Sequence, residues 1–180
     1  MKIDIYITET LEGREGKCEM YKEKCNIEVI TIEKEIIVYG LNLQSSGLPI
    51  NFDSLGVMWD KYTEDIKNNT PYRADIETEY AVCLNKVPDY IVGVEINEIQ
   101  EAESGFMSFI IPTGKYVKVE FNGENHQDMV DTKLMARQKE AKKWAKNEKL
   151  KLNNEFTVEV YPKQTADMEY PEMYCLFPIL

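Results

Sequence analysis

The chain has 180 residues, of which 43% are hydrophobic and 11% aromatic, and its formal net charge is −11. This length accommodates one domain with a substantial core, and the composition is that of a packed globule rather than of a disordered segment. The acidic charge repels a phosphate backbone, so we expect no direct binding of nucleic acid by this chain.

The chain also lacks the sequence features of a membrane or exported protein. Its longest apolar runs, residues 90–96 and 106–111, are much shorter than the ~20 residues that cross a bilayer. The amino terminus MKIDIYITET has no basic segment followed by an apolar stretch, so it does not resemble a secretion signal. Without such a signal, the four cysteines are interpreted as reduced thiols. We therefore expect a cytoplasmic protein that makes no membrane contact.

The first half of the chain predicts a strand, a helix and two further strands, after an amino-terminal extension at 1–26 with a short strand or hairpin. The expected elements are strands at 2–8 and 27–43, a helix from about 53 to 66, and strands at 79–85 and 90–97. The stretch 27–43 is rich in β-branched residues, and Gly40 marks a bend or bulge in it. Apolar residues at steps of three and four predict the helix, which Asp53 or Ser54 caps.

The second half repeats this order of elements. The expected elements are a broken strand at 106–121, a helix at about 127–150, and strands at 156–162 and 173–179. Pro112 and Gly114 interrupt the first of these strands about where Gly40 interrupts its counterpart. The pattern predicts an α+β fold of two β-α-β-β repeats, at about 27–100 and 105–180, related by pseudo-two-fold symmetry. Antiparallel sheets and two main helices would leave a cleft between the halves.

Residue types for hydrolytic or metal chemistry are scarce. The single histidine, His126, lies in the polar run FNGENHQD, and no HExxH, GxSxG or phosphate-loop motif occurs. Cys83 and Cys175 have no partnering histidine that would make either a nucleophile. Cys18 and Cys25 are spaced too widely for a zinc knuckle. We therefore assign no catalytic residue, no metal site and no cofactor, and expect a binding protein rather than an enzyme.

Glu159 is the polar residue that stands out. In the run FTVEVY it shares one face of the strand with Thr157 and Tyr161, and glutamate is depleted in the middle of strands. One interpretation is a carboxylate on a solvent-facing sheet. If that face lines the cleft instead, a partly buried carboxylate among aromatic rings attracts organic cations. The candidate rings, each also compatible with a place in the core, are Trp59, Tyr90, Tyr116 and Tyr174.

Short motifs in both halves indicate a family. In chain order they are VYGLNL, LGVMWDKYTEDI, YAVCL, DYIVGVEI, IPTGKYVKVEFNG, KKWAKNEK, FTVEVYPK and MYCLFPIL. Together they cover about 27–180 and resemble the GyrI-like effector-binding domains, the ligand modules of AraC-type and MerR-type multidrug regulators. The resemblance implies two repeated modules with a ligand cleft, and its F-x-x-E-x-Y glutamate falls on Glu159. It places Tyr174 where several multidrug-binding members have a pocket tyrosine, and it matches Tyr116 and Tyr90 to further aromatic positions.

We therefore expect a stand-alone protein that binds a small molecule, of the lipophilic, cationic and drug-like kind. Two alternatives stay open. One is a hydrolase of electrophilic natural products, with Glu159 as general base. The other is a protein-binding inhibitor of the gyrase-inhibitor type, whose acidic surface meets a basic partner.

Two further expectations concern the ends of the domain and the symmetry of the cleft. Residues 1–26 are too short and too strand-like for a helix-turn-helix, so we do not expect a complete regulator. When the third elements of the two repeats are superposed, Glu159 falls near Cys83. We therefore expect a single carboxylate, on the second-half wall of the cleft.

Overall fold

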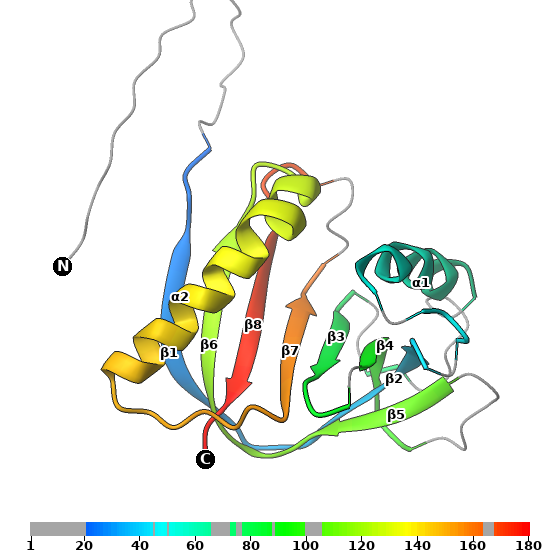
Figure 1. The fold of residues 1–180 in the computed structure, drawn as a ribbon, viewed down its shortest axis with the longest axis horizontal. Coiled ribbons are helices and arrows are strands. Elements are labelled where there is room, and N and C mark those ends of the chain that lie inside the picture. Colours follow the sequence, from blue (N-terminus) through cyan, green and yellow to red (C-terminus); the bar gives the residue numbers. More distant parts are fainter. Residues whose placement is uncertain are drawn as a thin grey trace, which may run out of the picture.

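The computed structural model describes residues 21–44, 46–49, 51–65, 73–74, 77–87, 89–99, 106–163 and 168–180. Within them, eight strands form one antiparallel sheet and two helices lie on one face of it (Figure 1). The elements are β1 (Cys25–Ile32), β2 (Ile36–Asn42), α1 (Phe52–Asp65), β3 (Glu79–Leu84), β4 (Asp89–Ile96), β5 (Phe106–Ile111), β6 (Gly114–Asn122), η1 (Asp128–Lys133), α2 (Leu134–Asn147), β7 (Phe156–Tyr161) and β8 (Glu172–Pro178). The strand predicted at 2–8 lies outside the described residues, and the domain boundary near residue 26 stays a prediction.

The order of the strands across the sheet shows how the two halves are joined. It runs β1-β6-β8-β7-β3-β4-β2-β5, and all neighbours are antiparallel. Each half keeps three strands together, whereas β1 pairs with β6 of the second half and β5 pairs with β2 of the first. The predicted α+β fold of two related halves is confirmed, with two strands rather than one before each helix.

Both long strands predicted from the sequence are divided in two. The first breaks at Glu33, Lys34 and Glu35, so Gly40 lies inside β2 rather than at a bulge. Gly40 is instead the register partner of Gly93 in β4, and a Cβ atom on Gly40 would lie 1.9 Å from the backbone oxygen of Val92. The glycine therefore permits two backbones to approach closely.

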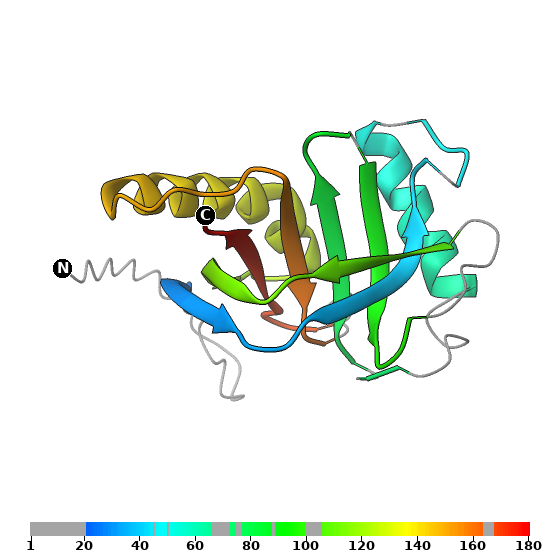
Figure 2. The same cartoon turned by 90° about the horizontal axis from the view of Figure 1, so that it is seen from below.

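Each helix is seated on its own half of the sheet. Helix α1 packs on β4 and β2, whereas α2 packs on β6 and β1, so the central strands β3 and β7 lie between the helices (Figure 2). Asn51 caps α1, in place of the predicted Asp53 or Ser54, because its Oδ1 accepts hydrogen bonds from the Ser54 amide and hydroxyl, both at 2.9 Å. None of the helices in the described part of the chain has the length and apolar character of a membrane span.

The two faces of the sheet bury separate clusters. Under the helices, Tyr62 of α1 and Ala141 of α2 belong to one continuous core. The opposite face has its own apolar cluster, to which β7 contributes Val158 and Val160. Because side chains alternate along a strand, Glu159 lies on the face that carries the helices.

Candidate functional site

Glu159 lies in the middle of β7, one of the two central strands of the sheet. It is opposite Ala81 of β3 on one side and Cys175 of β8 on the other, and it is only 5% exposed. Because β7 of the second half pairs with β3 of the first half, this carboxylate lies at the seam between the two halves. Burying a charged group costs free energy unless the fold compensates it, so its surroundings decide what it does.

The carboxylate accepts hydrogen bonds from four neighbouring side chains. Its Oε2 accepts from the hydroxyls of Tyr90, at 3.1 Å, and Tyr161, at 3.2 Å. Its Oε1 accepts from Nε2 of Gln138, at 3.2 Å, and from the thiol of Cys83, at 3.7 Å. All four donors are neutral groups. A carboxylate offers about four lone-pair sites, so these donors occupy its full accepting capacity.

Aromatic rings extend from the carboxylate towards α1. The Trp59 ring meets the Tyr161 ring edge to face, with 5.4 Å between centroids and an interplanar angle of 79°. Trp59 packs in the same manner on Tyr62, at 5.6 Å and 89°. The first half thus brings a helix tryptophan to a tyrosine that binds Glu159, and edge-to-face pairs of this kind fix the positions of the rings.

Burial sets the protonation behaviour of the site. It raises the pKa of Glu159, and the hydrogen bonds from Tyr90, Tyr161, Cys83 and Gln138 act against that rise. Burial, and next the charge of Glu159, raise the pKa of the two tyrosine hydroxyls and of the Cys83 thiol well above their usual values. These three groups therefore stay protonated as donors while Glu159 ionises.

The structure brings together three of the five residues that the sequence singles out. Glu159 and Tyr90 are hydrogen-bonded, and Trp59 reaches Glu159 through the Tyr161 ring. The other two, Tyr116 and Tyr174, lie on the opposite face and do not meet Glu159. The reason is the period of a strand: Cys175 shares the face of Glu159, so its neighbour Tyr174 points away.

The two tyrosines of the opposite face have partners of their own. Tyr116 is 1% exposed and its hydroxyl donates to the Pro112 carbonyl at 2.7 Å. Tyr174 is half-buried, with the Lys118 ammonium 4.7 Å from its ring centroid. A ligand role for either tyrosine stays a prediction, and it would concern a place other than Glu159.

Sequence reasoning did not assign three of the residues that contact Glu159. Tyr161 was within reach, because strand alternation already puts it on the same face. Cys83 was identified only as the counterpart of Glu159 in the other repeat, and the two side chains prove to be in contact. Gln138 had no signal, since it is one polar residue among many on α2.

A second buried carboxylate lies on the same face, so the expectation of a single one is wrong. Glu79 of β3 is 8% exposed, accepts a hydrogen bond from the Tyr62 hydroxyl at 3.4 Å and is the register partner of Tyr161. These carboxylates do not make a metal site: among the described residues, no three His, Cys, Asp or Glu side chains gather as ligands.

A family model identifies the chain's relatives. Residues 22–178 match the family described as "Cass2: Integron-associated effector binding protein". The chain belongs to this family of effector-binding proteins. The GyrI-like resemblance is thereby confirmed. No curated protein matches the sequence at a significant level.

Solved structures of low sequence identity share the fold. The integron cassette protein VCH_CASS2 from the mobile metagenome of Vibrio cholerae is 15% identical, with a TM-score of 0.53 over 89% of this chain and 100% of that one. The EcmrR C-terminal domain is 15% identical, with a TM-score of 0.64 over 88% and 98%. SAV2435 bound to tetraphenylphosphonium is 11% identical, with a TM-score of 0.60 over 86% and 94%.

Proposed function

We propose that this protein binds lipophilic organic cations at Glu159, between the two halves of the sheet. The observation that carries the proposal is a carboxylate, 5% exposed, whose hydrogen-bond donors in the described part of the chain are all neutral. Neutral donors lower the cost of burying the charge but do not cancel it. A cationic ligand supplies the missing opposite charge.

The aromatic surroundings define the apolar part of the ligand. Tyr90 of the first half and Tyr161 of the second half donate to the carboxylate, and the Trp59 ring packs on the Tyr161 ring. Ring faces attract cations and offer apolar contact that does not depend on an exact ligand shape. SAV2435, which shares this fold, has been solved with tetraphenylphosphonium, a cation whose charge lies inside aromatic groups.

The hydrogen bonding of Glu159 favours a cation without N–H groups. Four donors already fill the accepting sites of the carboxylate, so a ligand meets its charge but finds no free lone pair. A primary ammonium would lose hydration without a hydrogen bond in return, whereas a phosphonium or quaternary ammonium ion has no such bond to lose. The same full occupancy disfavours hydrolysis, because a nucleophilic water needs a lone pair of the base.

A titration with tetraphenylphosphonium tests the proposal. We expect saturable binding to the wild type and at least about tenfold weaker binding to Glu159→Gln, because the amide keeps the shape and removes the charge. Binding should also weaken as acidification protonates Glu159. Glu95→Gln is the matched control, since Glu95 is a half-buried glutamate that accepts from a tyrosine, Tyr80, at 3.2 Å on the opposite face. Equal affinity of the wild type and Glu159→Gln would contradict the proposal.

A further inference from the structure

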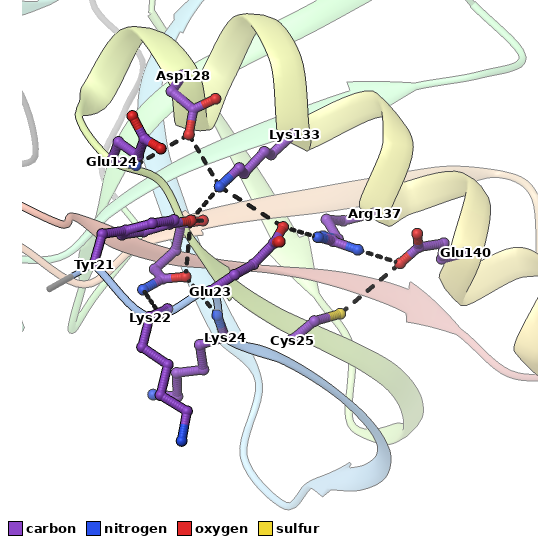
Figure 3. Close-up of polar contacts among 11 residues, drawn as sticks. Tyr21, Lys22, Glu23, Lys24, Cys25, Glu124, Asp128, Lys133, Arg137 and Glu140 are labelled. Atoms are coloured by element: carbon purple, nitrogen blue, oxygen red, sulfur yellow. Dashed lines mark hydrogen bonds and ion pairs between the residues drawn. The ribbon is translucent and has the colours of Figure 1, made fainter. Parts of the chain in front are cut away.

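Residues 21–25, of which Cys25 begins β1, are joined to the rest of the fold by side-chain contacts (Figure 3). The Asn122 amide, at the end of β6, is bonded through both of its atoms: Oδ1 accepts from the Lys24 backbone amide at 2.7 Å, and Nδ2 donates to the Lys22 carbonyl at 3.0 Å. The Lys24 ammonium pairs with Glu120 at 2.9 Å. We call residues 21–25 the amino-terminal clasp.

The clasp also contacts one face of the helical segment formed by η1 and α2. The Arg137 guanidinium pairs with Glu23 of the clasp and, at 2.7 Å, with Glu140 one turn further along α2. Lys133 lies over the Tyr21 ring, 4.5 Å from its centroid, and pairs with Glu23 at 3.7 Å. Because Lys133 and Arg137 are four residues apart, they are neighbours on the helix surface, and Glu23 lies against both.

The residue after Arg137 reaches the binding site. Gln138 donates to Glu159 at 3.2 Å, and its Nε2 lies 3.8 Å from the Cys175 sulfur. Successive residues of an α-helix point about 100° apart, so the clasp and Glu159 contact two sides of the same helical turn. A rotation or slide of this turn changes the distance between Gln138 and Glu159.

An irregular helical segment, η1, directly precedes α2. η1 is a π-helix over Asp128–Lys133, and its last residue, Lys133, is held by Asp128 at 3.0 Å as well as by the clasp. π-helical turns are rare and recur at functional sites. The clasp therefore acts at the junction where the π-helix passes into α2.

We propose that Arg137 is a positioning residue for the binding site: held by Glu23, it fixes the turn of α2 from which Gln138 donates to Glu159. This inference rests on the proposed function only for its effect on ligand affinity. Its effect on the ionisation of Glu159 can be measured without any ligand. Losing the Gln138 hydrogen bond should raise the pKa of Glu159 further, since that bond favours the charged form.

The titratable groups that face Glu159 do not ionise in the pH range in which Glu159 is titrated. They are Cys83 of β3, Tyr90 of β4, Tyr161 of β7 and Cys175 of β8, with Lys142 of α2 as a cation whose charge reaches both thiols. The pKa of each of these thiols and hydroxyls is raised well above its usual value. Glu159 therefore ionises first as the pH rises.

The test is Glu23→Gln in the full chain, with the titration of Glu159 followed by NMR of carboxyl-labelled glutamate. We expect the midpoint to move to higher pH. Direct electrostatics predicts the opposite sign, because removing a nearby negative charge favours the ionised carboxylate. Tetraphenylphosphonium binding near the midpoint should weaken by about three- to tenfold, the effect of one hydrogen bond. An unchanged or lower midpoint would overturn the proposal.

Two further variants make the test specific. Lys139→Gln changes an exposed charge on the same helix and should leave the midpoint unchanged. In a Gln138→Met background, Glu23→Gln should have no further effect, and an additive effect would show that Glu23 acts by another route. If the midpoint moves as expected but the wild type does not bind tetraphenylphosphonium, the proposed function fails and the positioning role stands.

Discussion

The two halves repeat one order of elements but supply different chemistry at their seam. The first half contributes Tyr90, Trp59 and the Cys83 thiol, whereas the second contributes Glu159 and the amide of Gln138. The Cys83 sulfur lies 3.7 Å from the carboxylate, so a glutamate in its place would put two like charges in one buried site. Like charges at that distance suppress each other's ionisation. A duplicated fold can therefore keep a strong charge at its symmetry seam only by making its halves unequal.

The sheet shows a second inequality between the halves. In the first half, β2 and β4 meet at the glycine pair Gly40 and Gly93, where any Cβ atom collides with backbone. The corresponding strands of the second half, β6 and β8, pair over 116–122 and 172–178 without a glycine. Of these two strand pairs, only the one in the first half therefore brings its backbones into such close approach.

The largest expected effect is a loss of stability when the close approach of β2 and β4 is disrupted. We expect Gly40→Val to lower the free energy of unfolding by about 3 kcal/mol or more, since the added side chain meets backbone that cannot move aside. Urea denaturation measures it. Gly56→Ala in α1 is the control: nothing lies within 4 Å of its Cβ position, so the helix should gain about 0.5–1 kcal/mol. Wild-type stability in Gly40→Val would refute the close approach.

A smaller effect concerns the carboxylate of the second half. Burial raises the pKa of Glu159 above its ordinary value of 4.5, so between that value and the raised pKa the folded state holds more protons than the unfolded state. The contribution of Glu159 to the free energy of unfolding should therefore decrease as the pH rises through this window. Glu159→Gln should lack that decrease when denaturation is repeated from pH 4 to pH 8. Parallel curves for the two proteins would exclude a raised pKa of Glu159 in the folded state.

The smallest effect uses the two tryptophans, one in each half. Trp59 packs on Tyr161 beside Glu159, whereas Trp144 of α2 packs on the core cluster under the helices. We expect tetraphenylphosphonium to change the fluorescence of Trp144→Phe, which retains Trp59, but not that of Trp59→Phe. The latter should also bind about two- to threefold more weakly, from the loss of ring contact. A fluorescence change on ligand addition that persists in Trp59→Phe, which retains Trp144, would contradict a binding site at β7.

Local patterns predict much of this arrangement. The alternation in β7 is enough to separate Glu159 and Tyr161 from their valine neighbours. Alternation could not assign Tyr174 of β8 to a face of the sheet. Residues 173, 175 and 177 share one face and residues 174 and 176 share the other, but both sets are apolar, so the pattern does not show which set lies under the helices. Gln138 and the clasp depend on contacts between distant segments, such as Glu23 with Arg137, for which no local pattern exists.

The exchange of β1 and β5 between the halves has a consequence for how the chain folds. Among the described strands β1 pairs only with β6, which follows the whole first half in the sequence, and β2 gains its outer neighbour only when β5 arrives. Pairings between such distant segments slow folding, because the intervening loop must close before the contacts form. Neither half is then expected to form a stable sheet as an isolated fragment. A nascent chain would expose the edge of β2 until β5, the first strand of the second half, has emerged, which makes that edge the place for early misassociation.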